Sequence, residues 1–197
     1  GIMARLGDSE MCIREMLKNV SDNKDRTRTT LKIGEICEYD LDTPKEKLAE
    51  NCEKAEFVFH LAGVNRPQDP AKFMAGNFGF SSELLSALKQ SRNTCPVMLS
   101  SSIQATLIGR YDGDYGRSKK AGEELFFAYA GETGAKVLVY RFPNLFGKWC
   151  RPNYNCAVAT FCHNIANDLP IRVNDRNTEL ELLYIDDLVQ EMLDALE

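Results

Sequence analysis

Tyr115 and Lys119 have the residue types and spacing most suggestive of chemistry in this sequence. They lie four positions apart in the string YGRSK, at the start of a stretch with helical periodicity. Residues at this spacing share one face of a helix, one turn apart. A lysine ammonium beside the phenol, with a cofactor's positive ring nearby, lowers the pKa of the tyrosine towards a usable range. Such a tyrosine could exchange a proton with a carbonyl or hydroxyl group.

The tyrosine–lysine pair is a weak signal when taken alone, because a chain with seven tyrosines often contains it by chance. Tyr111 is an internal comparison, since a tyrosine and not a lysine stands four positions after it. A second feature is the run of serines from Ser100 to Ser102, which ends thirteen residues before Tyr115. Its hydroxyls could face a ligand, and the alternative is a serine-rich turn that leads into a loop.

Two kinds of segment alternate along the chain and would position these residues. Short apolar runs, rich in Val, Ile, Leu and Phe, are typical of strands buried on both faces of a parallel sheet. These runs cover residues 35–39, 55–63, 95–101, 135–142 and 180–185. Stretches with helical spacing cover residues 11–20, 44–53, 70–92, 115–132, 155–168 and 186–197. The alternation predicts a doubly wound parallel α/β sheet in a single domain, residues 1–197.

Three of the predicted strands end in polar or glycine-containing segments. These segments are residues 60–67, 100–106 and 141–149. Ligands of doubly wound sheets bind beyond the carboxyl ends of the strands. The functional site is therefore expected at this edge of the sheet.

Composition and charge argue against several classes of protein. The net charge is −5, and the single basic cluster is interrupted by an aspartate and by threonines, which indicates a solvated loop. The cluster consists of Lys24, Arg26, Arg28 and Lys32. We therefore expect no nucleic-acid partner and no membrane partner. No apolar run reaches the roughly 18 residues of a membrane span, and the N-terminal stretch lacks the apolar centre of a secretory signal.

The cysteines predict the compartment. All seven are scattered through a chain that is long enough to form its own core, which favours free thiols in a reducing cytoplasm over a disulfide framework. Three of them, Cys150, Cys156 and Cys162, recur every six residues. Zinc ligands usually come in closer pairs, so we predict no metal site.

Several motifs taken together resemble the extended short-chain dehydrogenase/reductase family, the NAD-dependent epimerase/dehydratases. Besides the serines and YGRSK, the family patterns correspond to His60–Gly63, Arg141–Gly147 and Tyr184–Leu188. The resemblance covers about residues 35–197. Longer strings, such as FHLAGVNRP and RFPNLFGKWCRPNYN, look like the reductase domain of CapF-type enzymes of bacterial capsular-polysaccharide biosynthesis. Those enzymes reduce a 4-keto UDP-linked deoxy-N-acetylhexosamine.

The resemblance implies a Rossmann-like fold, a nicotinamide cofactor and a catalytic set of Ser102, Tyr115 and Lys119. Ser101 and Thr106 are less favoured alternatives for the serine. Tyr115 would supply a proton to the developing alkoxide, and Ser102 would hydrogen-bond the same oxygen. Lys119 would lower the pKa of Tyr115 and contact the nicotinamide ribose. The same residues would serve an epimerase or dehydratase, so the reaction stays open between these and a reductase.

Further binding residues are implied by the same resemblance. For the cofactor they are Asp40, Leu61, Ala62, Gly63, Asn77, Ser100, Tyr115, Lys119 and Phe142. For the nucleotide sugar they are Asn65, Arg66, Gln104, Asn144 and Arg176. Asp40 closes the predicted strand EICEYD, and in this fold an acid at that position accepts hydrogen bonds from the adenine-side ribose, which weakly favours NAD over NADP. The alternative is that Asp40 or Asp42 caps the helix that follows near Pro44.

The N-terminal segment departs from the family pattern. A dinucleotide fold opens with a strand and G-x-x-G-x-x-G, whose glycines let the backbone approach the pyrophosphate. Before residue 35 the sequence contains only Gly1, Gly7 and Gly34, and no segment there has the pattern of a buried strand. We expect the first strand and glycine loop to be lost by truncation, which could also affect the C-terminus, or to be replaced. A binding or assembly module without activity is therefore a second hypothesis.

Three weaker features complete the sequence predictions. His60 lies in an apolar strand, so a core histidine is preferred over a catalytic one. The segment from Trp149 to Tyr154 is either a loop that holds a sugar or uracil ring or a plain surface loop. Relatives in this family often pair through two helices, which here correspond to 70–92 and 115–132. Since the second contains the apolar string FFAYA (126–130), we expect a homodimer through these helices.

Overall fold

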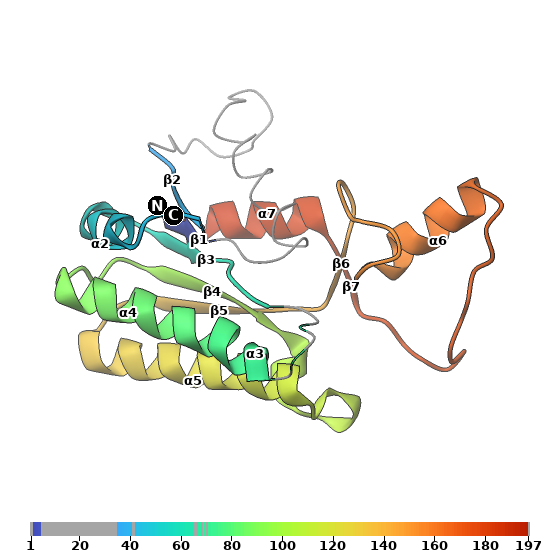
Figure 1. Cartoon of the computed structure of the whole chain (residues 1–197), viewed down its shortest axis with the longest axis horizontal. Coiled ribbons are helices and arrows are strands. Elements are labelled where there is room, and N and C mark those ends of the chain that lie inside the picture. The colour runs from blue at the N-terminus through green and yellow to red at the C-terminus, as the bar shows by residue number, and fades with distance from the viewer. Residues whose placement is uncertain are drawn as a thin grey trace. The chain divides into compact units, whose positions relative to one another are not determined.

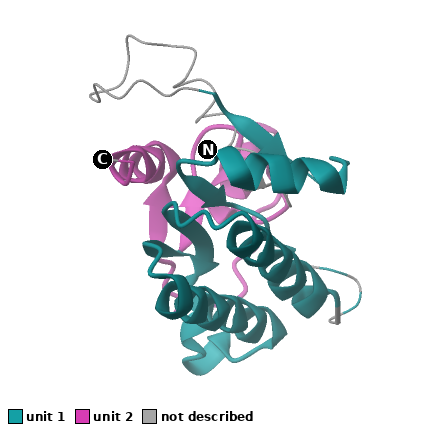
Figure 2. Cartoon of the chain, turned by 90° about the vertical axis from the view of Figure 1, so that its left-hand side faces the viewer, with its two compact units in different colours: residues 1–10, 33–142 teal, residues 11–32, 143–197 magenta. Residues whose placement is uncertain are grey.

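The structure is a computed structural model that describes residues 2–4, 35–40, 42–64, 67, 69 and 71–196. The chain forms two compact units, coloured separately in Figure 2. The first unit comprises residues 1–10 and 33–142, and the second comprises 11–32 and 143–197. That residues 1–197 form a single domain remains a prediction.

A five-stranded parallel sheet forms the centre of the first unit (Figure 1). The strands stand in the order β2–β1–β3–β4–β5, and every neighbouring pair is parallel. Their bounds are β1 Ile2–Ala4, β2 Cys37–Tyr39, β3 Val58–His60, β4 Val97–Ser102 and β5 Val137–Phe142. The chain order reverses direction across the sheet at β1, which is the topology of a doubly wound fold and confirms the predicted fold class.

The sequence predicted that the first strand would be missing, but the structure contains it as β1. Ile2 pairs with Cys37 on one side and with Val58 on the other, so β1 lies between β2 and β3. Three residues are too few to show a hydrophobic period, which is why the sequence gave no sign of this strand. The predicted helix at 11–20, the basic cluster at 24–32 and the expected place of a glycine-rich loop lie outside the described residues.

Helices α2, α4 and α5 pack on one face of this sheet, and Figure 1 shows α4 and α5 side by side there. The helical bounds are α2 Lys45–Lys54, α3 Ala71–Met74, η1 Ala75–Gly79, α4 Phe80–Gln90, η2 Ile103–Thr106, η3 Gly109–Tyr111 and α5 Asp114–Thr133. The element η1 is a π-helical turn that joins α3 to α4, whereas η2 and η3 are 3₁₀ turns between β4 and α5. Leu84, Val97 and Phe126 are fully buried between helices and strands.

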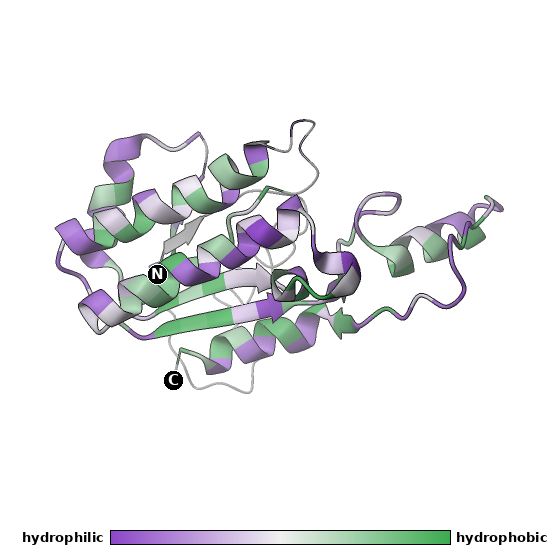
Figure 3. Cartoon of the chain, turned by 90° about the horizontal axis from the view of Figure 1, so that it is seen from below, coloured by the Kyte–Doolittle hydropathy of each residue, from purple (hydrophilic) through white to green (hydrophobic). Residues whose placement is uncertain are grey.

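Polarity changes along the strands of the first unit. Val97, Met98 and Leu99 form the apolar first half of β4, and three serines form its second half. Figure 3 shows the same change, with the strands green over most of their length and white or purple towards their carboxyl ends. The apolar halves hold the sheet to the helices by burial, which leaves the polar ends available to a site.

The second unit contains a separate parallel pair of strands and two helices. The elements are β6 Asn144–Phe146, α6 Ala157–Ala166, β7 Leu182–Tyr184 and α7 Ile185–Asp194. The predicted strand at 180–185 is confirmed as β7, but it pairs with β6 and not with the five-stranded sheet. Pro143, which has no N–H to donate, follows β5 directly and separates it from β6.

The helices predicted at 44–53, 70–92, 115–132, 155–168 and 186–197 are all found, as α2, the α3–η1–α4 run, α5, α6 and α7. The cysteines within the described residues are all free. No helix of the described part is long and apolar enough to cross a bilayer.

Candidate active site

The carboxyl edge of the five-stranded sheet collects most of the predicted site residues. Ser102 ends β4 and stands opposite Phe142, which ends β5. Leu61, Ala62 and Gly63 follow β3 directly and are buried. Asp40 follows β2 and is half-buried. Because parallel strands end at the same edge of a sheet, the fold brings these segments to one edge of the five-stranded sheet.

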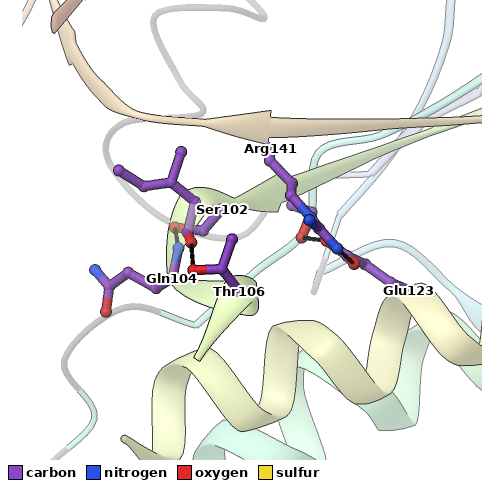
Figure 4. Close-up of polar contacts among 7 residues, drawn as sticks. Ser102, Gln104, Thr106, Glu123 and Arg141 are labelled. Atoms are coloured by element: carbon purple, nitrogen blue, oxygen red, sulfur yellow. Dashed lines mark hydrogen bonds and ion pairs between the residues drawn. The ribbon is translucent and has the colours of Figure 1, made fainter. Parts of the chain in front are cut away.

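The hydroxyl of Ser102 is distinguished from its two alternatives by its hydrogen bonding (Figure 4). Ser102 is buried, and its Oγ accepts a 3.2 Å bond from the backbone N–H of Gln104, which uses a lone pair of the oxygen and not its O–H. In contrast, Ser101 Oγ donates to Glu123 Oε1 at 2.6 Å. Thr106 Oγ1 donates to the carbonyl of Ile103 at 2.8 Å. The geometry therefore favours Ser102 as the hydroxyl that donates to a ligand.

Tyr115 and Lys119 are neighbours on one face of α5, as the spacing predicted. The Nζ of Lys119 lies 5.9 Å from the centroid of the Tyr115 ring. The same Nζ donates a 3.0 Å hydrogen bond to the carbonyl of Ser100, and Lys119 is buried. Tyr115 is half-buried and packs edge-on against Phe73, with 5.6 Å between the ring centroids.

Two contacts hold the start of α5 against β4 and η2 on either side of Ser102. One is the bond from Lys119 to Ser100, two residues before Ser102. The other is the close packing of Gly116, where an added Cβ would lie 2.5 Å from the carbonyl oxygen of Gln104, two residues after Ser102. Ser102, Tyr115 and Lys119 are thereby brought to the same edge of the sheet.

Asn77 links the loop after β3 to the first turn of α5. Its side chain is buried in the π-helical turn η1. Asn77 Oδ1 accepts from the N–H of Val64 at 2.7 Å, and Nδ2 donates to Ser118 Oγ at 2.9 Å. Ser118 Oγ in turn donates to the carbonyl of Tyr115 at 2.8 Å. The sequence pointed to Asn77 but gave no sign of Ser118 as its partner.

An ion pair between buried Glu123 of α5 and exposed Arg141 of β5 was missed by the sequence predictions (Figure 4). Arg141 donates from Nε to Glu123 Oε1 at 2.9 Å and from a terminal nitrogen to Oε2 at 2.6 Å. Burial raises the pKa of the Glu123 carboxyl, but the hydrogen bonds from Arg141 and Ser101 outweigh it and hold the pKa below its usual value. Glu123 stands four residues after Lys119, so helical spacing could have revealed it.

His60 is a core histidine, as preferred from the sequence. It is buried, and its Nε2 lies 2.7 Å from Ser81 Oγ. Burial and, to a smaller extent, the charge of Lys119 lower the pKa of His60 to about 3. The imidazole is therefore neutral at physiological pH.

The remaining cofactor predictions have mixed outcomes. The backbone N–H of Asp40 donates to Thr43 Oγ1 at 2.9 Å, and α2 begins after Pro44 without a side-chain cap, so the capping alternative for Asp40 and Asp42 is not found. The Ser100 hydroxyl is buried and has no hydrogen-bond partner among the described residues. Its unsatisfied oxygen is compatible with a ligand group at this edge.

The substrate predictions fall in several places. Asn65 and Arg66 lie outside the described residues, and Gln104 is half-buried in η2. Asn144 and Arg176 belong to the second unit. There Asn144 Nδ2 donates to the carbonyl of Glu181 at 3.1 Å, which ties β6 to the residue before β7, and Arg176 is exposed.

The aromatic loop of the second unit, from Trp149 to Tyr154, is partly exposed. Trp149 is 59% exposed and has a left-handed φ of 60°. The guanidinium of Arg151 lies 5.6 Å from the centroid of the Tyr154 ring. No group of His, Cys, Asp and Glu side chains suited to a metal ion occurs within the described ranges.

Comparison with known proteins identifies the family of the chain. Residues 9–197 match the family described as "NAD dependent epimerase/dehydratase family". The chain is 41% identical over 163 residues to the UDP-2-acetamido-2,6-beta-L-arabino-hexul-4-ose reductase of Pseudomonas aeruginosa. The match covers 83% of this chain and 43% of that protein.

Solved structures resemble the chain over nearly its whole length. The capsular polysaccharide assembling protein CapF from Staphylococcus aureus has 41% sequence identity and a TM-score of 0.77, over 99% of this chain and 49% of that chain. A UDP-glucuronic acid 4-epimerase from Bacillus cereus, in complex with UDP-glucuronic acid and NAD, has 18% identity, a TM-score of 0.73, and coverage of 100% and 73%. The second likeness shows the fold alone. The chain spans less than half the length of the reductase and of CapF.

Proposed function

Because the chain belongs to the NAD dependent epimerase/dehydratase family, we propose that it forms the catalytic part of a nucleotide-sugar oxidoreductase. Its proposed reaction is reduction of the 4-keto group of a UDP-linked deoxy-N-acetylhexosamine during synthesis of a surface polysaccharide. The two relatives with 41% identity, one a UDP-sugar reductase and one a capsular polysaccharide assembling protein, support this substrate class.

The placement of Lys119 is the structural observation that carries the proposal. Its buried ammonium faces the Tyr115 ring and bonds the Ser100 carbonyl, so a positive charge stands beside the phenol that would act as the acid. A nearby cation favours the ionised phenolate, which lowers the pKa of the phenol and eases loss of its proton.

A nicotinamide cofactor, when bound, would supply the hydride for the proposed reaction. Tyr115 Oη donates its proton to the oxygen of the sugar carbonyl as negative charge develops there. Ser102 donates a hydrogen bond to the same oxygen, which stabilises that charge. Lys119 stabilises the phenolate that Tyr115 becomes. The overall reduction consumes one hydride and one proton and yields the 4-hydroxyl.

The described residues fit the nicotinamide half of such a cofactor. Ser100 Oγ offers a buried hydroxyl without a partner in the described part, at the carboxyl end of β4. Lys119 bonds the carbonyl of the same serine and lies beside the Tyr115 ring. Asp40 follows β2, beside β1, where an acid disfavours a 2′-phosphate, so we favour NAD.

Two measurements on the 197-residue chain test the proposal. Titration of NADH and NADPH, followed by nicotinamide fluorescence, measures cofactor binding. Incubation with a UDP-linked 4-keto sugar then measures cofactor oxidation, with the product separated by chromatography. Stoichiometric oxidation supports a reductase. Interconversion of sugar epimers without net oxidation would identify an epimerase instead.

The second candidate function is a binding or assembly module. The observation that favours it is the scarcity of glycine before residue 35, where only Gly1, Gly7 and Gly34 occur. A folded chain that binds a UDP-sugar but neither NADH nor NADPH would support the module and contradict the oxidoreductase.

The assembly and compartment are also proposed. We favour a homodimer through the exposed faces of α4 and α5, where Phe127 is 56% exposed. The segment FFAYA exposes less apolar surface than its sequence suggested, because the side chains of Phe126 and Tyr129 are buried in the core. Free cysteines throughout the described residues support a reducing compartment such as the cytoplasm.

A further inference from the structure

We propose that His60 and Ser81 are positioning residues that hold the Asn77 amide in one orientation. That amide joins the loop after β3 to the start of α5. The inference rests on the proposed function in one respect, because both segments belong to the proposed cofactor site. The hydrogen bonds themselves are independent of any ligand.

Asn77 lies in the π-helical turn η1, where the wider turn alters the regular helix bonding. Ser81 is four residues further along, and its Oγ donates to the carbonyl of Asn77 at 2.7 Å. This bond fixes the backbone from which the Asn77 side chain projects. A serine hydroxyl has only one proton, so Ser81 Oγ cannot donate a second hydrogen bond and can only accept one.

The direction of the hydrogen bond between His60 and Ser81 follows, because the single proton of Ser81 is already donated. Since the Ser81 proton goes to the Asn77 carbonyl, Ser81 Oγ accepts from His60 Nε2 at 2.7 Å. His60 is therefore the neutral tautomer with its proton on Nε2. Its Nδ1 is buried and has no hydrogen-bond partner among the described residues, so a proton on Nε2 avoids leaving a buried N–H donor unsatisfied at Nδ1.

Two aromatic rings pack against the imidazole and restrain its orientation. The ring centroids of Phe80 and Phe126 each lie 5.5 Å from that of His60, the first edge-on and the second stacked. His60, Asn77, Ser81 and Ser118 are all at least 95% buried, so water does not compete with these bonds.

The Asn77 side chain has only one orientation that satisfies its partners. Oδ1 accepts from the Val64 N–H and Nδ2 donates to Ser118 Oγ, whose own proton goes to the Tyr115 carbonyl. A flipped amide would place an NH₂ group against the Val64 N–H. His60 and Ser81 thus fix the amide from its backbone side, and the amide fixes the loop and the helix relative to each other.

The test compares Ser81→Ala with the matched variant Ser82→Ala, which alters the next serine of α4. Amide hydrogen exchange, measured by NMR on the ligand-free chain, reports the Val64 N–H that bonds Asn77 Oδ1. In Ser81→Ala we expect Val64 to exchange about tenfold faster or more, because a buried bond is lost, while the amides of β4 keep their protection. Ser82→Ala should leave Val64 unchanged. Equal Val64 exchange in both variants would overturn the proposal.

A second measurement needs no variant and covers the case in which Ser81→Ala does not fold. The chain has two histidines, and ¹⁵N-labelled histidine gives separate ring signals for buried His60 and exposed His163. We expect His60 to remain the neutral Nε2–H tautomer from pH 5 to 8. A proton on Nδ1, or an imidazolium in this range, would refute the inferred bond direction. Neither readout uses cofactor, so a failure of the proposed enzyme activity is distinguished from a failure here.

Discussion

At the scale of single residues, the buried charge of Lys119 is the most informative feature. Burying an ammonium costs free energy unless it finds partners, and here the Ser100 carbonyl and the face of the Tyr115 ring provide them. A positive charge beside the Tyr115 ring favours the ionised form of the phenol, as the proposed role of Tyr115 requires.

Replacement of Tyr115 by Phe removes the proposed acid while keeping the ring that packs on Phe73. We expect kcat for keto-sugar reduction to fall by about 100-fold or more, the usual contribution of a general acid, with the melting temperature unchanged. Steady-state kinetics and thermal denaturation measure the two effects.

Tyr111→Phe is the matched control for that experiment. Tyr111 precedes Tyr115 by one helical spacing, and its hydroxyl accepts a 3.2 Å bond from exposed Arg110, outside the Lys119 contact. Its kcat should stay close to that of the unaltered chain. Retention of more than a few per cent of kcat by Tyr115→Phe would remove Tyr115 from the acid role.

The buried His60 predicts a pH dependence of stability. Burial and Lys119 lower its pKa from 6.5 to about 3, so below pH 6.5 the unfolded chain binds a proton that the folded chain does not. The free energy of unfolding should therefore fall as the pH drops from 6.5, by up to about 1.4 kcal/mol per pH unit from this group. Urea denaturation between pH 7.5 and about 5 measures the slope.

His60→Gln supplies the comparison, because Gln does not titrate and its amide N–H can still donate to Ser81. The variant should have a flatter dependence of unfolding free energy on pH across this range. If both chains show the same slope, His60 is not held neutral by the fold.

At the scale of elements, α5 combines the site with the packing that holds it. Tyr115, Lys119 and Glu123 recur every four residues and so share one face. Lys119 contacts β4, and Glu123 contacts β5 through Arg141. A helix that buries two charged residues on its inner face departs from ordinary amphipathic patterning, which is typical of a functional element.

Gly116→Ala tests whether the close approach of α5 to η2 is required. The new Cβ would lie 2.5 Å from the carbonyl oxygens of both Gln104 and Tyr111, so the backbone must shift. We expect a loss of about 1–3 kcal/mol in the free energy of unfolding, measured with urea.

Gly131→Ala is the matched control on the same helix, because nothing lies within 4 Å of its added Cβ. Removing a glycine from a helix without steric conflict should stabilise the chain by about 0.5–1 kcal/mol. Two variants with the same effect on stability would mean that the contact at Gly116 imposes no constraint.

At the scale of the whole molecule, the proposed homodimer depends on the outer faces of α4 and α5. Phe127 is exposed on α5, and the ion pair between Lys89 and Glu132 joins the two helices at 3.0 Å. We expect sedimentation at micromolar concentration to show a dimer, and Phe127→Glu to shift the population towards monomer by burying an unpaired charge.

The control for assembly is Phe127→Tyr, which keeps the aromatic ring and should keep the dimer. A monomer for the unaltered chain at micromolar concentration would contradict the proposed interface. The helices themselves would be unaffected, since the core side chains Phe126 and Tyr129 point inwards.

The sequence by itself determined the features that depend on local periodicity. The apolar runs predicted β2 to β5 and β7, and β3 and β4 have the consecutive buried positions of strands covered on both faces. For β2, β5 and β7 the predicted burial on both faces is wrong, because most of their residues are only partly buried or exposed. The pairing of Tyr115 with Lys119 was also predictable, since a helix places residues four apart on one face whatever surrounds it.

Only the tertiary structure decided the features that depend on which distant segments meet. The three residues of β1 acquire their place from pairing with β2 and β3, and no local pattern encodes such pairing. Ser102 is the available hydroxyl because Ser101 donates to Glu123 and Thr106 donates to the carbonyl of Ile103. The bond from Ser101 to Glu123 spans 22 positions of the chain. The lysine's bond to the Ser100 carbonyl likewise exists only once α5 lies against β4, because a hydrogen bond requires its partners within about 3 Å and sequence spacing does not fix that distance.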